Sequence, residues 1–328
     1  MPARRRNQLP SAVRRWAWIT AGVTVVLLVA TAALWVAARP DHHAPAATRV
    51  VVAGAADPSA VVALDDGGFR YAERRTGNVR EVDRRGRLLT EPIAHVAVRS
   101  EPGQRGLLGL AVDRGGDTYA AWTRSSDGHL VVGRVAPGAT RLVWEGPTST
   151  KLANGGRLAF TPEGRLLIGV GELERPQSTP DPAAPNGKLL SLDPRAEPSQ
   201  EFRVVSSGWH NPFAFTYARG DRLWLADNAP GNKSERITRG DRKGAPVATT
   251  GDLRPLAPSA LVPLGKSRLG LCGYVSRVMR EIRLDGDRPS PPGRVLVDHC
   301  AIAAAMLADG RVVVTDDSSV RVTLRPLT

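Results

Sequence analysis

The sequence lacks a block of basic residues after its first 40 positions. Six of the 45 arginines and lysines lie in residues 1–40, which hold no acidic residue, and the other 39 are dispersed among 32 acidic residues. A nucleic-acid-binding protein normally gathers its cations on one face or along one helix. Nucleic acid is therefore not an expected partner, and the dispersed arginines are better explained as a solvated surface.

Aromatic residues are also scarce, at 5%, and no long amphipathic helical pattern occurs. Glycine (33 residues) and proline (26 residues) are frequent, and 23% of the residues are charged. This composition is typical of a turn-rich globular protein and argues against disorder. A length of 328 residues is long for one domain, but all-β barrels and propellers reach it as single units.

Only one long hydrophobic run is present, at residues 16–38. It is free of charge over 23 residues, which is long enough to cross a hydrocarbon layer of about 30 Å. Trp16, Trp18 and Trp35 lie near its ends, where amphipathic rings favour the membrane interface. Five arginines precede the run and Arg39 alone follows it closely, so the positive-inside rule places the N-terminus in the cytoplasm.

These features predict a single-pass protein of the cell membrane with its bulk on the extracytoplasmic side. The alternative is a cleaved signal peptide, because small residues precede Arg39. The predicted parts are a cytoplasmic basic tail (1–15), a transmembrane signal-anchor (16–38), a tether (39–48) and an exported domain (49–328).

Cysteine is nearly absent, since the chain has two, Cys272 and Cys300, and both fall in the exported part. An oxidising compartment favours a disulfide between them, joining the last two repeats described below. Two buried free thiols are the alternative.

Six short segments of the exported part repeat one pattern, in which a turn with Gly or Asp leads into an apolar strand. The spacings between their marker glycines are 48, 48, 56, 45 and 45 residues. A period in the forties with strand-type segments is typical of propeller blades. The marker glycines are Gly68, Gly116, Gly164, Gly220, Gly265 and Gly310.

The last repeat supplies about three strands, whereas a propeller blade normally has four. Residues 48–52, Thr-Arg-Val-Val-Val, form an unpaired strand candidate just after the tether. We expect this strand to complete the last blade. The fold predicted from the sequence is therefore an all-β, six-bladed β-propeller preceded by one N-terminal transmembrane helix.

Five motifs occur in the order seen in the PQQ-dependent glucose/sorbosone dehydrogenase family, which this sequence resembles over roughly residues 55–326. The resemblance implies a six-bladed propeller that oxidises sugars or related alcohols with pyrroloquinoline quinone (PQQ), assisted by calcium. The motifs are GQRGLLGLAV (103–112), NGGRLAFTPEGRLLIGVGE (154–172), NGKLLSLDP (186–194), SGWHNPFAF (207–215) and LWLADNAPGNKSE (223–235).

The catalytic positions depart from the family pattern. Oxidation of an alcohol by a quinone needs a general base, and the family has a histidine just before the glycine pair. This chain has Ala153 there, and a methyl group cannot take a proton. Where the family has an aspartate that orients the histidine and the cofactor, this chain has Glu172.

The cofactor positions agree only in part. PQQ carries three carboxylates, so its pocket needs fixed cations, and arginine pairs with them best. Gln104, Arg157 and Asn211 match the family, and the resemblance implies that they would contact PQQ if it is retained. His210 stands where the family has an arginine, and the resemblance implies it as the fourth PQQ contact if PQQ is retained.

The calcium positions are also altered. The family's Glu-His-Gly-Pro stretch reads Asp-Asn-Ala-Pro here, ending at Pro230, and the following acidic pair is Ser-Glu. The resemblance implies Asp227, Pro230 and Glu235 as calcium contacts if the ion is retained.

Two functions from different classes follow. The first is a membrane-tethered propeller that has lost PQQ redox chemistry and binds a sugar-like ligand or a protein partner at its channel mouth. The second is a PQQ-dependent sugar or alcohol dehydrogenase in which His210 or Glu172 replaces the missing base. An unrelated reaction, such as lactone hydrolysis in another calcium-using propeller, is a further alternative.

Overall fold

The computed structural model describes residues 44–327 except 219–220, 232 and 254–255. The predicted basic tail and membrane anchor, and residues 39–43 of the tether, lie outside this part of the chain. Within it, no helix is long and apolar enough to cross a membrane. The compact unit begins at Pro45, and its described helices are the short 3₁₀ turns η1 (Pro176–Ser178) and η2 (Gly251–Leu253).

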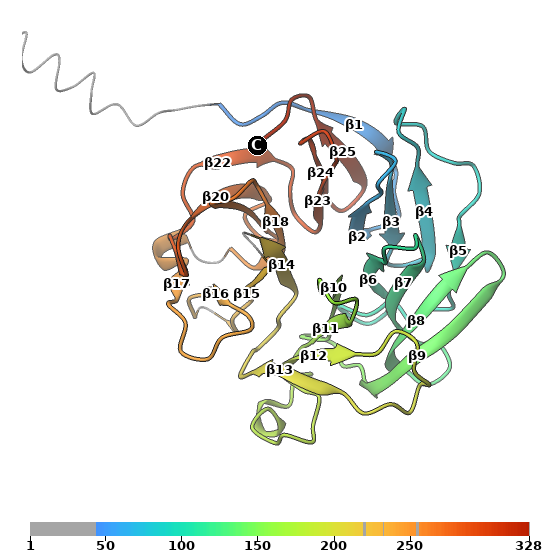
Figure 1. Cartoon of the computed structure of the whole chain (residues 1–328). Coiled ribbons are helices and arrows are strands. Elements are labelled where there is room, and N and C mark those ends of the chain that lie inside the picture. The colour runs from blue at the N-terminus through green and yellow to red at the C-terminus, as the bar shows by residue number, and fades with distance from the viewer. Residues whose placement is uncertain (1–43, 219–220, 232, 254–255, 328) are drawn as a thin grey trace, which may run out of the picture. The chain divides into compact units, whose positions relative to one another are not determined.

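Six antiparallel sheets are arranged in a ring (Figure 1), which confirms the predicted six-bladed propeller. Blade 1 contains β2 (Pro58–Ala63), β3 (Phe69–Glu73), β4 (Asn78–Val82) and β5 (Ala94–His95). Blade 2 contains β6 (Leu107–Val112), β7 (Thr118–Thr123), β8 (His129–Ala136) and β9 (Ala139–Thr148). Blade 3 contains β10 (Gly155–Phe160), β11 (Leu166–Val170), β12 (Lys188–Leu192) and β13 (Arg203–Ser207).

The other three blades follow the same order from the centre outward, except that the last blade takes its outer strand from the N-terminus. Blade 4 contains β14 (Ala214–Ala218), β15 (Arg222–Asp227), β16 (Arg236–Arg239) and β17 (Ala248–Thr249). Blade 5 contains β18 (Pro258–Pro263), β19 (Arg268–Gly273), β20 (Val278–Asp285), β21 (Arg288–Pro289) and β22 (Val295–Asp298). Blade 6 contains β23 (Ala304–Met306), β24 (Val312–Thr315), β25 (Ser319–Thr323) and β1 (Thr48–Ala53).

The repeated glycines occupy the hairpin turns between the first and second strands of the blades. Gly116, Gly164, Gly265 and Gly310 all have φ between +77° and +86°, a left-handed conformation that favours glycine. Gly68 lies beside Gly67, which has φ +89°. The glycine repeat in the sequence therefore reflects a hairpin turn of the same geometry that recurs from blade to blade. Gly220 falls outside the described residues.

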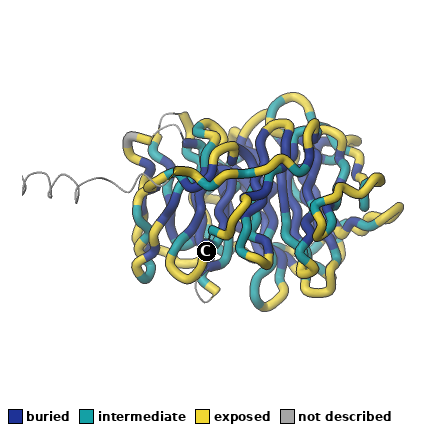
Figure 2. The backbone as a smooth tube through the Cα atoms, turned by 90° about the horizontal axis from the view of Figure 1, so that it is seen from above, coloured by how far each residue is buried: buried dark blue, intermediate teal, exposed yellow. Residues whose placement is uncertain are grey.

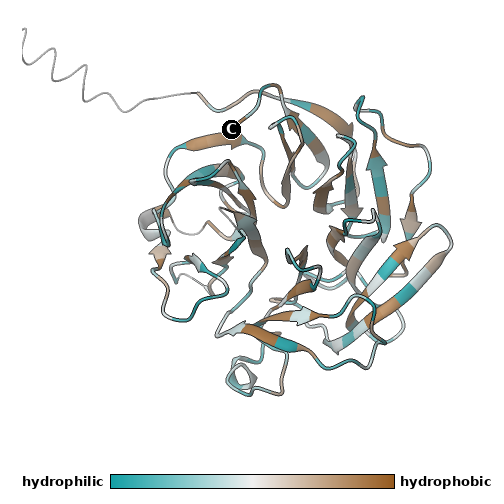
Figure 3. Ribbon diagram, in the orientation of Figure 1, coloured by the Kyte–Doolittle hydropathy of each residue, from teal (hydrophilic) through white to brown (hydrophobic). Residues whose placement is uncertain are grey.

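The hydrophobic core is divided among the six junctions between neighbouring blades. Each junction holds one apolar cluster, built from residues of the two blades that meet there. Strands such as β11, Leu-Leu-Ile-Gly-Val, are buried at every position because both faces of the sheet are covered. Figure 2 shows buried strands between two layers of exposed loops, and Figure 3 shows that many of these strands are hydrophobic.

The ring closes through strands from both ends of the chain. β1 pairs with β25 in antiparallel register, with Thr48 opposite Thr323 and Ala53 opposite Ser319. The prediction that residues 48–52 complete the last blade is therefore confirmed.

The propeller has two faces. The upper face is defined here by the loops that lead into the innermost strands, and the lower face by the hairpin turns that hold the marker glycines. The chain enters blade 6 at the lower face, where the Leu324 N–H donates to Ala47 O and the Leu327 N–H donates to Gly310 O. Ala55 has reached the upper face and donates to Ser318 O.

Blades 5 and 6 are joined covalently as well. Cys272 in β19 and Cys300 in the loop before β23 form a disulfide with a Cα–Cα distance of 5.4 Å, and both side chains are buried.

We expect the Cys272→Ala/Cys300→Ala variant to lose about 3 to 4 kcal/mol of unfolding free energy, because the bridge closes a loop of 28 residues. Urea denaturation measures this loss, and peptide mapping without reductant that finds two free thiols contradicts the pairing.

Candidate functional site

The loop that precedes β10 is held in a strained backbone conformation. Ala153 is buried and has φ +52°, which is unfavourable for alanine. Its N–H donates to Gln104 Oε1 at 3.0 Å, and its carbonyl accepts the Leu173 N–H at 3.1 Å. These bonds hold residue 153 in place, but its side chain is a methyl group.

The glycine pair after Ala153 allows β10 and its neighbours to approach closely. A Cβ at Gly155 would lie 2.2 Å from Gly169 O, and one at Gly156 would lie 2.6 Å from Leu108 Cβ. Both glycines also have positive φ. Their role is therefore to let backbones pack together beneath the channel mouth.

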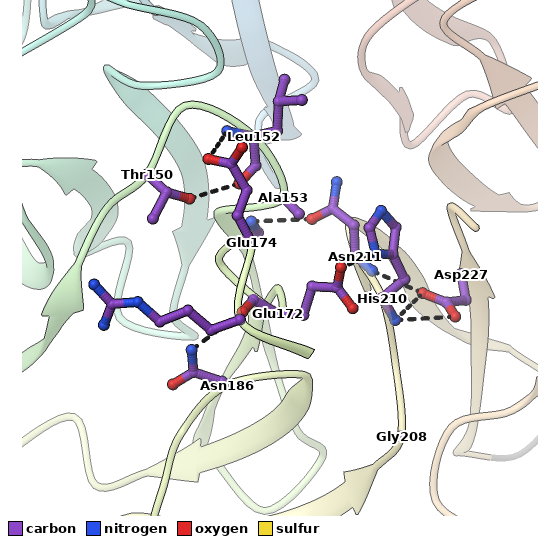
Figure 4. A network of polar contacts seen from close by, with 12 residues as sticks. Thr150, Leu152, Ala153, Glu172, Glu174, Asn186, Gly208, His210, Asn211 and Asp227 are labelled. Carbon is purple, nitrogen blue, oxygen red and sulfur yellow. Dashed lines mark hydrogen bonds and ion pairs between the residues drawn. The ribbon is translucent and has the colours of Figure 1, made fainter. Parts of the chain in front are cut away.

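Asp227 organises the polar contacts beside this loop (Figure 4). Its buried carboxylate accepts the N–H groups of His210 (3.0 Å) and Asn211 (2.9 Å) and pairs with Arg236 at 2.6 Å. The Asn211 Oδ1 in turn accepts the Gly155 N–H at 3.0 Å. Asp227 thus fixes the backbone that carries Asn211 against the glycine pair.

His210 and Glu172 face each other. The His210 Nδ1 lies 2.8 Å from the Glu172 Oε1, which suits an ion pair, although the contact lacks hydrogen-bond geometry. The Glu172 N–H also donates to His210 O at 2.8 Å. The structure brings these two predicted residues together, but neither lines the cavity described next.

A cavity of about 200 Å³ opens at the upper face between the inner ends of the blades. Two of the predicted cofactor residues, Gln104 and Asn211, line it, whereas Arg157 and His210 do not. Other lining residues were not identified from the sequence: Asp57, Ser59, Arg74, Asn154, Asn228, Ser259 and Tyr274.

One signal could have indicated two of these residues. The tripeptide Pro-Ser-Ala opens both β2 and β18, and its serines, Ser59 and Ser259, both line the cavity. In each strand the pairing register shifts at this point, between residues 58 and 60 and between 258 and 260.

The charges of the cavity wall are compensated within the protein. Arg74 is the only lysine or arginine among the described lining residues, and its guanidinium pairs with Asp57 at 2.6 Å. Its Nη1 also donates to the carbonyls of Gly103 (3.0 Å) and Arg105 (2.7 Å). No cation of the described wall is therefore left to bind an anion.

Arg157 lies deeper, on the channel axis below the cavity. Its side chain is buried, stacks over the Phe213 ring at 4.3 Å and donates only to backbone carbonyls. Burial lowers the pKa of the guanidinium to about 10, so it remains charged at neutral pH. The acceptors are Phe213 O (3.1 Å), Ser259 O (3.0 Å) and Ile302 O (3.3 Å).

The predicted calcium contacts are engaged by protein groups. The Asp227 carboxylate is used as described above, and the Glu235 carboxylate accepts the Thr250 hydroxyl and the N–H groups of Leu256 and Ala257. Pro230 lies on an exposed loop. In the described part of the chain, no group of three or more acidic, histidine or cysteine side chains could hold a metal ion.

The fold and site define a six-bladed propeller with a small polar pocket at one end of its channel. The family model for Glucose / Sorbosone dehydrogenase matches residues 55–255. The chain therefore belongs to this family. No curated protein matches the sequence significantly.

Solved structures of sugar dehydrogenases share the fold. A putative oxidoreductase of the glucose dehydrogenase type from Thermus thermophilus is 26% identical, with a TM-score of 0.68, over 84% of this chain and 99% of that one. The PQQ-bound aldose sugar dehydrogenase of Streptomyces coelicolor is 20% identical, with a TM-score of 0.70, over 85% and 99%. The soluble aldose sugar dehydrogenase of Escherichia coli, in its apo form, is 19% identical, with a TM-score of 0.69, over 84% and 98%.

Replacement of Arg157 tests its role on the channel axis. We expect Arg157→Ala to lower the unfolding free energy by about 3 kcal/mol or more, because three buried carbonyls lose their donor. The matched control is Arg114→Ala, since Arg114 is exposed and donates to the single carbonyl of Pro162. Its change should stay within about 0.5 kcal/mol. Equal losses in urea denaturation of the two variants would contradict this role.

Proposed function

We propose that this protein is a ligand-binding propeller that has lost the PQQ redox chemistry associated with its family and is held at the extracytoplasmic side of the cell membrane. The observation that carries the proposal is Ala153, a buried methyl group at the position of the general base. A positioned general base commonly contributes about 10² to 10⁴ in rate.

The neighbouring side chains offer poor replacements for that base. His210 and Glu172 contact each other and do not line the cavity in which a substrate would meet a cofactor. A base must lie within hydrogen-bond reach of the proton that it removes. This arrangement favours the binding function over a dehydrogenase with a rearranged site.

The cavity wall does not suit PQQ. Three carboxylates entering the cavity would find one guanidinium, that of Arg74, which is already bonded to Asp57 and to backbone carbonyls. Leaving buried charge without a partner is costly. Calcium fits no better, because N–H donors, a hydroxyl and Arg236 already occupy the carboxylates of Asp227 and Glu235.

The membrane location is proposed from residues 1–38 alone. The apolar run at 16–38 with arginines on its N-terminal side is the supporting feature. The disulfide between Cys272 and Cys300 is consistent with an oxidising compartment on the far side of the membrane.

The loss of redox chemistry is tested with the purified full-length protein. We expect no quinone spectrum after incubation with PQQ and calcium, no thermal stabilisation, and no dye-linked oxidation of glucose or sorbosone. The Ala153→His variant should also remain inactive, because it restores a base without supplying cations for the three carboxylates.

One result would overturn this proposal. It is PQQ-dependent dye reduction by the unmodified protein that disappears in the His210→Ala variant. That outcome would instead support a dehydrogenase in which His210 is the base.

The anchor is tested by intact-mass analysis of the protein isolated from its native membrane. We expect the N-terminal tail and the apolar run to be retained, since the run is longer than the apolar region of a signal peptide. A mature chain that starts near Arg39 or Pro40 would show that the segment is cleaved.

A further inference from the structure

We propose that the channel-mouth cavity binds an uncharged carbonyl compound that carries an apolar substituent, such as a lactone, an ester or an amide. This inference rests on the binding function proposed above and specifies its ligand. It follows from three properties of the wall: unpartnered hydrogen-bond donors, compensated charge and an exposed apolar rim.

Ser259 supplies the first unpartnered donor. The residue is 4% exposed, lines the cavity, and its Oγ has no hydrogen-bond partner in the described structure. The equivalent Ser59 donates its hydroxyl to Leu107 O. A buried hydroxyl without a partner costs stability, and a ligand atom in the cavity would complete the bond.

Gln104 and Asn211 supply two more donors, and their orientation is fixed. Each side-chain oxygen accepts a backbone N–H, from Ala153 and Gly155 respectively. If either amide were flipped, its NH₂ group would face a backbone N–H, and two donors cannot form a hydrogen bond. Each NH₂ group therefore points away from the backbone N–H that its side-chain oxygen accepts. Among the described residues, neither NH₂ group has a hydrogen-bonded acceptor.

This set of donors selects the charge of the ligand. Amide and hydroxyl hydrogens bind a neutral carbonyl oxygen well, and the ligand then brings no net charge into the site. A carboxylate would also accept these bonds, but it would find no free cation on the described wall, since Arg74 is paired with Asp57. The wall therefore favours a neutral acceptor over an anion.

Part of the rim of the cavity is apolar. Tyr274, which lines the mouth, is 55% exposed, its neighbour Val275 is 51% exposed, and Leu152, next to Ala153, is 46% exposed. An apolar substituent of a ligand at the mouth would cover part of this exposed surface. At about 200 Å³ the cavity is smaller than a typical small-molecule pocket, so a carbonyl head enters it and an apolar substituent lies on the rim.

Backbone strain is concentrated at the same place. Eight non-glycine residues of the described chain have φ between +52° and +63°. Asp57 and Ala257 line the cavity, and Ala153, Leu173 and Glu174 belong to the loops beside it. Strain of this kind persists where the surrounding structure enforces it, commonly at binding sites.

The test uses titration calorimetry of the full-length protein with N-hexanoyl-L-homoserine lactone, which is uncharged and combines two carbonyls with an apolar chain. Its ring-opened acid has nearly the same size but carries a carboxylate, and the N-acetyl lactone lacks the long chain. We expect the hexanoyl lactone to bind, and the other two compounds to bind at least about tenfold more weakly.

Variants locate the binding groups. Gln104→Glu and Asn211→Asp keep an acceptor for the backbone N–H but remove the NH₂ donor, and each should weaken binding of the lactone at least about tenfold. Ser259→Ala should weaken it about five- to tenfold without lowering the melting temperature. The matched control is Ser276→Ala, because the Ser276 hydroxyl is also buried and unpartnered in the described structure but does not line the cavity.

Three outcomes would overturn the inference: no binding of the lactone at millimolar concentration, equal binding of lactone and acid, or equal effects of Ser259→Ala and Ser276→Ala. Failure of the proposed function is detected separately, as PQQ-dependent dye reduction. A protein that neither uses PQQ nor binds the lactone would reject this inference and leave the proposed binding function in place.

Discussion

The guanidinium of Arg157 is the interaction on which the centre of this propeller depends. Neighbouring blades contact each other through separate apolar clusters, so no single core spans the described ring. Arg157 starts from blade 3 and reaches carbonyls just before or within the innermost strands of blades 4, 5 and 6. One side chain thereby bonds blades that do not all touch each other. The dipoles of three backbone carbonyls balance its positive charge, so no carboxylate is required as a counter-ion.

The same arginine separates two regions of the channel. Below it, a cavity of about 330 Å³ is lined by the innermost strands of all six blades and is largely apolar. Above it, the smaller cavity is lined by amides and hydroxyls on loops of the upper face. Because Arg157 donates to the carbonyls of Phe213, Ser259 and Ile302, which line the upper cavity, it contributes structure to that cavity and no binding charge.

The sequence predicted the fold well because the fold repeats a local rule. A left-handed turn that requires glycine recurs at Gly116, Gly164, Gly265 and Gly310. Such turns can be recognised from the spacing of glycines in the sequence. The strand at 48–52 was predicted for a related reason, since an apolar strand needs a partner. The site was harder to predict. Whether a residue of the right type faces a ligand depends on side-chain direction, which the sequence does not contain.

Arg157 and Glu235 illustrate that difference. The family resemblance predicted them as a cofactor contact and a metal contact. In the structure, the β10–β11 register is irregular between Gly155 and Leu158, and Arg157 donates to Ser259 O. Glu235 accepts N–H groups of the loop that enters blade 5. For Ser259 the only sequence signal is the repeated Pro-Ser-Ala tripeptide, which does not reveal that its hydroxyl lacks a partner in the described structure.

Closure by β1 has a consequence for the synthesis of the protein. The first strand of the described chain, β1, pairs with β25, which the ribosome makes only after the strands of the five other blades. Until then, β1 lacks its strand partner and presents unpaired backbone, which can associate with other chains. A chain that terminates before Ser319 leaves the ring open permanently. The pairing of β1 with β25 is therefore the event that distinguishes a complete propeller from a truncated one.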